Sequence, residues 1–353
     1  MPVEGDVEGD VAIGAGPAAH ASTVAHRPAF LDVVSAAATI GVGSLPHREV
    51  DAAAEFSFDA FDVLTLPSLP RRCPAEAPIA QALVGAPGVT LGQYGTVAID
   101  VSRLDPAAGV RTEFASDRFA GFRACLDLAV RRGHAGPVKW QFVGPISVGI
   151  ALRRGGAPSD VAFSMASRVV QSHLRSLAAH ISDALPDAPQ LVVIDEPFLD
   201  GLMAHDFPIA PEEAIDLLSS AMASVETSAT VGVHACGDVD VSTLVASGPK
   251  VLSLPARISL EPYAGYLARF LDGGGAIAWG AVPTEGPIGG AAGRTAGRLE
   301  GLWSRLIDRG CDPVRIRRQS LISPQCGLGG HSTSVAERVC STARAVSRTV
   351  QPY

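Results

Sequence analysis

One histidine and two cysteines in this sequence have the residue types and the positions expected of metal ligands. His234 and Cys236 follow the buried-strand pattern of residues 230–233, and Cys326 follows a similar run at residues 320–323. Residues two apart on a strand point to the same face, so the imidazole and the first thiol are expected side by side. Thiolate and imidazole suit zinc, and a catalytic zinc site keeps one position open for substrate. The three residues therefore predict a zinc site, against the alternative of a strand-end histidine and two unrelated buried cysteines.

The composition limits the class of protein. A chain of 353 residues with 47% hydrophobic residues can bury a sizeable core, as one large α/β domain or as two ordinary ones. The formal net charge of −8 argues against nucleic acid or an anionic membrane as the main partner. Six irregularly spaced cysteines do not resemble a disulfide framework in a chain this long, so reduced thiols and a cytoplasmic location are expected.

The distribution of apolar residues along the chain predicts how it is divided. No apolar run is long enough to cross a bilayer, and the first residues lack the basic-then-apolar layout of a signal peptide. Residues 1–30 are rich in Gly, Ala, Val and acidic residues without clear periodicity, which predicts a loosely ordered leader. Residues 31–353 are predicted to form a single catalytic domain.

The fold class follows from the alternation of two patterns. Eight apolar, β-branched runs predict strands at residues 39–44, 61–66, 138–144, 191–196, 230–233, 250–254, 276–280 and 320–323. Apolar residues three and four apart predict helices at residues 49–58, 115–131, 160–185, 211–225, 239–246, 260–271, 292–308 and 334–346. Continuous apolar strands alternating with amphipathic helices imply a parallel sheet covered by helices. Eight such units predict an α/β fold of the closed (β/α)8 TIM barrel type.

The second unit of this barrel is interrupted. Residues 89–100 lie in a long segment after the second predicted strand, and their pattern predicts a hairpin rather than a barrel strand. A long insertion on the carboxyl side of a barrel strand usually helps to form the active site. The alternative is a surface excursion without a functional role.

Polar residues fall where the predicted strands end, which is where barrel enzymes do their chemistry. Ser44 follows the first strand, Asp195 and Glu196 end the fourth, and Glu285 follows the seventh. An acidic pair directly after three apolar residues is costly unless it is paired, hydrated or bound to something. We therefore predict Asp195 and Glu196 as substrate-binding residues, with helix capping and loop hydrogen bonding as the alternative.

The ligand types indicate a kind of reaction. A zinc ion bound by two thiolates and one imidazole holds a substrate thiol as thiolate at neutral pH, and that thiolate can take up an alkyl group. Water activation is the other use, but such sites favour several histidines over cysteines. The ligand set therefore favours thiol alkylation, and Asp195 at the same edge could hold the amino group of a small amino-acid thiol.

Four short motifs occur in order along the chain: Gly43-Ser44-Leu45-Pro46-His47, Ile194-Asp195-Glu196-Pro197, His234-x-Cys236 and Pro324-x-Cys326-Gly327-Leu328. Together they resemble the successive motifs of the cobalamin-independent methionine synthase family, in its C-terminal catalytic barrel. The wider superfamily also includes uroporphyrinogen decarboxylase. The resemblance spans residues 38 to about 345.

This resemblance implies a site and a reaction. It implies zinc (Zn2+) at His234, Cys236 and Cys326, and homocysteine bound near Ser44 and by Asp195 with its sulfur on the zinc. The implied activity is that of a methyltransferase, which moves a methyl group to that sulfur and gives methionine.

Three features depart from the family pattern. The family's glutamate ligand at the end of strand six is absent, because that place reads Ser253-Leu254-Pro255-Ala256; water, substrate, Glu196 or Asp238 could supply the fourth ligand. The family's catalytic histidine after strand seven is absent as well, and Glu285 is its predicted catalytic stand-in beside Asp195. The chain has no room for a second, N-terminal barrel that helps to bind folate, so methyl-folate and a corrinoid protein are both candidate methyl donors.

Two other functions share the same site. One is a related zinc-dependent alkyl-thiol transferase or lyase that acts on another small thiol, with Arg71 and Arg72 gripping an anionic tail. The other is a non-catalytic relative that keeps the metal for stability or sensing. Sequence does not decide between these functions and the methyltransferase.

Overall fold

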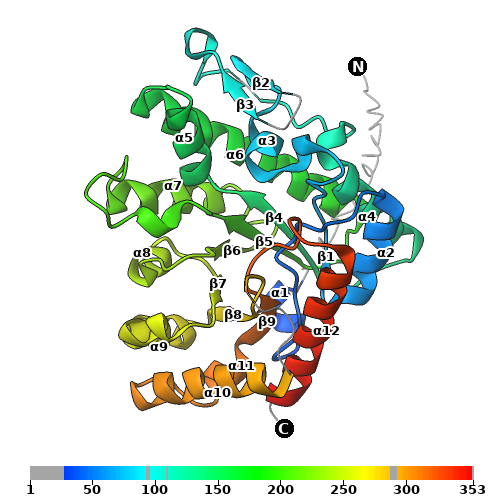
Figure 1. Ribbon diagram of the computed structural model, residues 1–353, viewed down its shortest axis with the longest axis vertical. Helices are drawn as coiled ribbons and strands as arrows, with labels where there is room; N and C mark the ends of the chain where they lie inside the picture. The colour runs from blue at the N-terminus through cyan, green and yellow to red at the C-terminus, as the bar shows by residue number, and fades with distance from the viewer. Residues whose placement is uncertain (1–27, 93–95, 109, 287–291, 352–353) are drawn as a thin grey trace, which may run out of the picture.

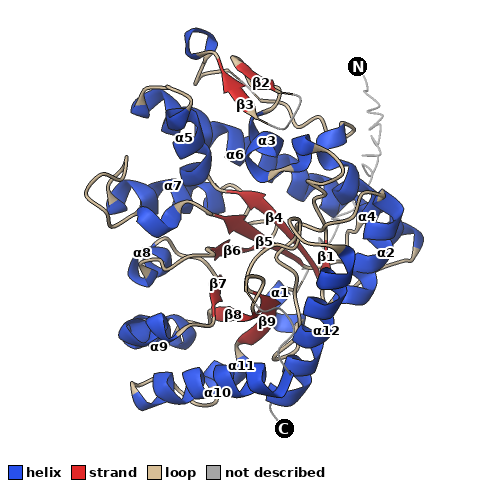
Figure 2. Cartoon of the chain, in the orientation of Figure 1, coloured by secondary structure: helices blue, strands red, loops and turns tan. Residues whose placement is uncertain are grey.

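A curled sheet of parallel strands forms the centre of the protein in the computed structural model, which describes residues 28–351 except residues 93–95, 109 and 287–291 (Figures 1 and 2). Its seven strands pair in the order β1-β4-β5-β6-β7-β8-β9. Their bounds are β1 (Leu64–Thr65), β4 (Val138–Val143), β5 (Gln190–Asp195), β6 (Thr230–His234), β7 (Val251–Pro255), β8 (Ala276–Val282) and β9 (Ser320–Pro324). Each strand pairs with the next one of this sheet along the chain, as in a barrel sheet.

Helices connect the strands and cover the outer face of the sheet (Figure 1). The α-helices are α1 (Phe30–Val33), α2 (Val50–Ala60), α3 (Pro78–Leu83), α4 (Ala120–Arg131), α5 (Pro145–Arg154), α6 (Ser159–Ala184), α7 (Pro211–Ala223), α8 (Val241–Ala246), α9 (Ala264–Asp272), α10 (Ala292–Asp308), α11 (Arg315–Arg318) and α12 (Thr333–Val350). Short 3-10 helices are η1 (Pro74–Glu76), η2 (Val101–Arg103), η3 (Asp117–Phe119), η4 (Leu199–Gly201) and η5 (Ile258–Tyr263).

The two edges of the sheet both contact the segment at residues 38–44. The Ile40 amide donates to the Ile322 carbonyl of β9 at 2.9 Å, and the Val63 amide just before β1 donates to the Thr39 carbonyl at 3.1 Å. The predicted α/β class with a parallel sheet is therefore confirmed, and the curl of the sheet is consistent with a TIM-like barrel.

The first predicted strand, at residues 39–44, is wrong as a regular strand. Only isolated parallel bridges occur there, at Thr39 with Ile322 and at Ser44 with Ser68. Side chains replace ladder partners in this segment, because the Gly41 amide donates to Thr65 Oγ1 at 3.0 Å. Gly43 has a φ of +143°, a backbone conformation that favours glycine and interrupts an ordinary strand.

The interior of the curled sheet is apolar toward the amino ends of the strands. One buried cluster fills it, consisting of Phe30, Ala38, Ile40, Val63, Leu191, Val193, Val251, Ala276, Ala278 and Leu321. Side chains alternate between the two faces of a strand, so Asp195 points to the same interior as Leu191 and Val193. The parallel register then sets His234 beside Asp195. Polar groups therefore occupy the carboxyl-end side of the same interior.

Two further elements bear on the predictions. Helix α5 begins directly after β4, which the sequence did not indicate; Pro145 at its first position suits a helix start. Strands β2 (Val89–Leu91) and β3 (Val97–Ile99) pair antiparallel in a separate two-stranded sheet. Residues 93–95 between them lie outside the described residues.

The predicted leader at residues 1–30 lies mostly outside the described residues, so the proposed domain division stays a prediction. Phe30, at its end, is only 1% exposed and starts α1 against the interior cluster. Among the residues that the structure describes, no helix is long and apolar enough to span a membrane.

Phe30 is expected to close the amino end of the sheet interior, so Phe30→Ala should lower the free energy of unfolding by about 3–5 kcal/mol through lost burial and a residual cavity. Urea unfolding followed by circular dichroism measures this. Val33→Ala on the same helix is the control, because Val33 is 43% exposed and its truncation should change stability by about 0.5 kcal/mol or less. Equal effects of both variants would contradict the packing role of Phe30.

Candidate metal centre

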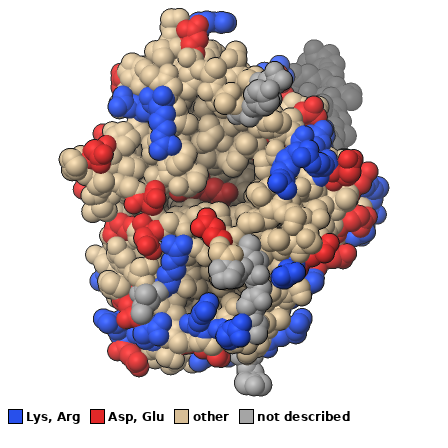
Figure 3. Space-filling model, in the orientation of Figure 1, with Lys and Arg blue, Asp and Glu red and all other residues tan. Residues whose placement is uncertain are grey.

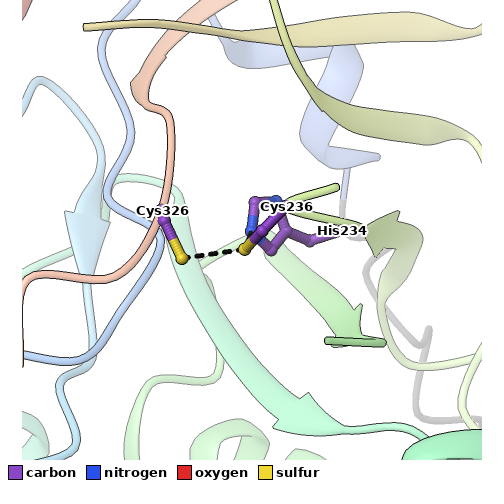
Figure 4. A group of neighbouring side chains, drawn as sticks. All are labelled: His234, Cys236 and Cys326. Atoms are coloured by element: carbon purple, nitrogen blue, oxygen red, sulfur yellow. Dashed lines mark hydrogen bonds between the residues drawn. The ribbon is translucent and has the colours of Figure 1, made fainter. Parts of the chain in front are cut away.

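His234, Cys236 and Cys326 converge at the carboxyl ends of β6 and β9, as the sequence predicts (Figure 4). Their ligand atoms all lie within 4.8 Å of one another. The two sulfurs, from residues ninety apart in the chain, are separated by 2.8 Å, and His234 Nε2 is 3.0 Å from the Cys236 sulfur. A sulfur separation of 2.8 Å exceeds the roughly 2.05 Å of a disulfide bond, so both cysteines are free thiols.

The orientation of the histidine ring is fixed from behind. His234 is 4% exposed, and its Nδ1 forms a hydrogen bond of 2.9 Å with Ser253 Oγ. Ser253 is the register partner of His234 on β7, so the contact follows from the pairing of the strands. With Nδ1 engaged, Nε2 faces the two sulfurs. Such a partner typically sets the tautomer and direction of a ligating imidazole.

The two thiols share a proton. A hydrogen bond from Cys236 lowers the pKa of Cys326, and the same bond raises the pKa of Cys236, aided by burial. The two opposite shifts belong to the pair of thiols rather than to either one alone. Two sulfurs and one imidazole nitrogen are ligand types that zinc takes in tetrahedral sites. With zinc–sulfur bonds of about 2.3 Å, tetrahedral sulfurs lie about 3.8 Å apart, so the two thiols would separate by about 1 Å to bind the ion.

Asp195 lies at the carboxyl end of β5, beside its register partner His234 at the carboxyl end of β6. Its Oδ1 is buried and has no hydrogen-bond partner among the described residues. Burial raises the pKa of Asp195 to about 6, while the charges of His234 and Lys139 oppose that rise. An unpaired carboxylate oxygen beside the thiols is suited to accept a hydrogen bond from a ligand. The substrate-binding role of Asp195 stays a prediction.

Glu196 takes the capping alternative rather than facing the thiols. Its two carboxylate oxygens accept the backbone amides of Ile146 at 3.0 Å and Ser147 at 2.7 Å, in the first turn of α5. Burial raises the pKa of Glu196 to about 7, against the lowering effect of these hydrogen bonds. Because both oxygens are engaged, the predicted roles of Glu196 in substrate binding and as a fourth ligand have no support in this geometry.

The other two carboxylates considered near the site lie at its rim. Asp238 is exposed and accepts Ser259 Oγ at 2.8 Å, with Arg257 at 3.7 Å, so it is directed to η5. Glu285 is exposed in the segment after β8, and its charge contributes to raising the pKa of Cys236. Its predicted catalytic role stays a prediction.

Ser44 holds the loop that carries Cys326. Its carbonyl accepts the Leu328 amide at 2.9 Å, and its hydroxyl oxygen accepts the Gly329 amide at 3.2 Å. Gly327 approaches so closely that a Cβ there would lie 2.2 Å from Ser44 Oγ. The sequence placed Ser44 in the substrate site; the structure adds this support of the loop.

The two arginines considered for an anionic tail have other partners. Arg72 forms ion pairs with Glu76 at 3.1 Å and Asp117 at 2.8 Å. Arg71 donates to the His331 carbonyl at 2.6 Å. Since two carboxylates neutralise Arg72, the alternative of a thiol with an anionic tail loses its second cation.

A cavity of about 450 Å³ lies on the side of Gly237, the residue after Cys236. Gly237 and Pro255 line it, together with Asp200, Asp240 and Tyr263. Figure 3 shows acidic side chains in and beside a hollow near the middle of this view of the molecule.

Solved structures that share the fold of this chain include two that are described as methionine synthases. One solved structure with this fold is described as a B12-independent methionine synthase from Shewanella sp. W3-18-1 in complex with selenomethionine; it has a TM-score of 0.54 and 14% identity and covers 90% of this chain and 98% of its own. Another is described as a candidate vitamin-B12 independent methionine synthase from Listeria monocytogenes, with a TM-score of 0.55, 15% identity and coverage of 91% and 99%. No protein-family model and no curated protein match the sequence.

Identities of 14–15% establish a shared fold and no more. The predicted resemblance to the cobalamin-independent methionine synthases is thus confirmed as a structural likeness over nearly the whole chain. The B12-independent description of both neighbours gives no support to a corrinoid protein as partner.

Ser253→Ala is expected to weaken metal binding by about 10- to 100-fold, because the His234 ring loses the hydrogen bond that directs Nε2 to the sulfurs. Competition with a chromophoric chelator measures the affinity. Ser259→Ala is the matched control, since Ser259 binds Asp238 outside the three ligands. An unchanged affinity in a folded Ser253→Ala protein would show that the ring needs no such support.

Glu196 is expected to make stability depend on pH. Its pKa rises from 4.5 to about 7 on folding, so its contribution is fully present below pH 4.5 and is lost as the pH rises through 7, by at most about 3 kcal/mol. Urea unfolding at several pH values should give a flatter profile for Glu196→Gln than for the wild type. Glu212→Gln, an exposed carboxylate on α7, is the control. Identical profiles for the wild type and Glu196→Gln would refute this assignment.

Proposed function

We propose that this chain is a zinc-dependent S-methyltransferase that moves a methyl group to the thiol of homocysteine and gives methionine. The observation that carries the proposal is the convergence of His234, Cys236 and Cys326 at the edge of a sheet with the fold of B12-independent methionine synthases. The Shewanella structure contains selenomethionine, the selenium analogue of the proposed product. A small amino acid with a methylated chalcogen therefore fits a neighbour with this fold.

His234, Cys236 and Cys326 would hold the zinc and leave the fourth position to the substrate. Zinc in such a site keeps a bound thiol deprotonated at neutral pH and leaves it nucleophilic. Ser253 keeps Nε2 of His234 directed at the sulfurs. Asp195, with its unpaired Oδ1, accepts a hydrogen bond from the ammonium group of homocysteine and sets the direction of the amino acid.

The methyl donor is proposed to be methyl-folate rather than a corrinoid. Transfer breaks a carbon–nitrogen bond of the donor and forms a carbon–sulfur bond, and the leaving nitrogen takes up a proton. Glu285 is the residue proposed to serve that proton transfer in place of the family's histidine. It is exposed in the segment after β8, and its charge contributes to raising the pKa of Cys236.

The finer description of the fold belongs to the same proposal. Residues 38–44 contact both edges of the sheet and would supply the remaining strand of a closed (β/α)8 barrel, with β2 and β3 as the hairpin inserted after its second strand. The barrel would comprise residues 31–353 behind a leader at residues 1–30. A cytoplasmic setting, without nucleic acid or membrane as partner, suits reduced thiols and a net charge of −8.

Metal analysis tests this function directly. Protein purified without added metal is expected to hold about one zinc per chain, which Cys236→Ser and Cys326→Ser lose together with methyl transfer from methyl-folate to homocysteine. Cys73→Ser, a half-buried cysteine outside the group, is the control and should keep both.

The outcomes separate the three functions. Folded wild-type protein without zinc would contradict the proposed methyltransferase function and both alternative functions. Zinc without transfer to homocysteine, but with alkylation of another small thiol, would favour the related alkyl-thiol enzyme. Zinc with no thiol alkylation would leave the non-catalytic relative.

A further inference from the structure

Lys139 is a buried cation that neither the predicted site nor the proposed reaction uses. It lies on β4 as the register partner of Leu191, which places it on the interior face, and it is 1% exposed. Only one other lysine, Lys250, occurs in the chain. Burying an ammonium group costs several kcal/mol unless good partners compensate. Burial lowers the pKa of Lys139 to about 8, and the Asp195 carboxylate opposes that shift.

The partners of this ammonium group lie on or against the segment at residues 38–44. Lys139 Nζ donates to the Val42 carbonyl and, at 2.8 Å, to Gln141 Oε1. The Gln141 side chain packs against Gly43, where a Cβ would lie 1.9 Å from its Cδ, and its Nε2 donates to the Leu66 carbonyl at 3.3 Å. The segment has only isolated β-bridges, at Thr39 and at Ser44. The hydrogen bond from Lys139 to Val42 holds the backbone between these two bridges.

The same segment contacts the loop that carries Cys326 through Ser44. Val42 and Gly43 precede Ser44, which accepts the amides of Leu328 and Gly329. Contacts therefore run without interruption from the Lys139 ammonium group through residues 42–44 to residues 327–329. A shift of the first would move the sulfur of Cys326 relative to that of Cys236.

We propose that Lys139 is a positioning residue of the metal centre, which holds residues 42–44 and through Ser44 fixes the loop that carries Cys326. Its positive charge also lies in the interior that faces Asp195, so it offsets negative charge where thiolates and a carboxylate gather. A neutral side chain of similar length cannot do both. The inference rests on the proposed function only in treating that loop as a ligand loop.

Hydrogen exchange in the full chain, after dialysis against a chelator, tests the positioning role without any metal. Lys139→Met is expected to speed amide exchange about tenfold or more in two segments distant in sequence, residues 41–45 and 327–331, because their shared support is lost. Ser44→Ala should speed exchange at residues 327–331 alone. Lys250→Met, at an exposed lysine, is the matched control and should change neither segment.

Cobalt binding adds a measurement that a general loss of stability would not change. Lys139→Met is expected to bind cobalt about 10- to 100-fold more weakly than Lys250→Met, with a weaker thiolate-to-cobalt charge-transfer band, under conditions in which both proteins are fully folded.

Wild-type exchange at residues 327–331 in folded Lys139→Met protein would overturn the proposal. If Lys139→Met does not fold, Ser44→Ala decides, and unchanged exchange at residues 327–331 in that variant overturns it as well. Failure of the proposed function gives a different result, because wild-type protein would then lack zinc while the exchange effects of Lys139→Met persist.

Discussion

Parallel pairing of three neighbouring strands is the constraint on which the centre depends. The register of β5, β6 and β7 puts Asp195, His234 and Ser253 in one row on the interior face of the sheet. The three side chains then act differently, because Ser253 orients the ring, His234 turns Nε2 outward from the row, and Asp195 leaves an oxygen unpaired beside it. A slip of one residue in any of these strands would turn its polar side chain to the outer, apolar face.

The second cysteine depends on a different kind of support. Cys326 comes from a loop after β9, and loops are mobile unless something ties them down. Ser44 does this with two hydrogen bonds, and Gly327 permits the close approach because it has no side chain. The candidate metal centre thus combines His234, held by paired strands, with Cys326, whose loop is held by hydrogen bonds to Ser44.

Electrostatics distinguishes the two carboxylates that adjoin each other at the end of β5. Glu196 points outward, where the first turn of α5 presents unpaired amides, and a carboxylate there meets both hydrogen-bonding need and the positive end of the helix. Asp195 points inward, toward the thiols and the buried ammonium group of Lys139. The last residue of β5 and the residue after it therefore divide into a site-facing and a structural carboxylate, as the alternation of side chains along an extended chain favours.

The sequence by itself determined the residue types and the strand ends: His234 and Cys236 two apart after an apolar run, Cys326 after another, and strands alternating with helices. These are local patterns, and local backbone preferences and burial decide them. Only the tertiary structure decided which polar atoms already have partners. It assigned Glu196 to α5, gave Ser253 to His234, and replaced a regular strand at residues 39–44 with contacts from Thr65 and Lys139. Those outcomes depend on register and on contacts between residues up to hundreds of positions apart, which no local pattern in the sequence records.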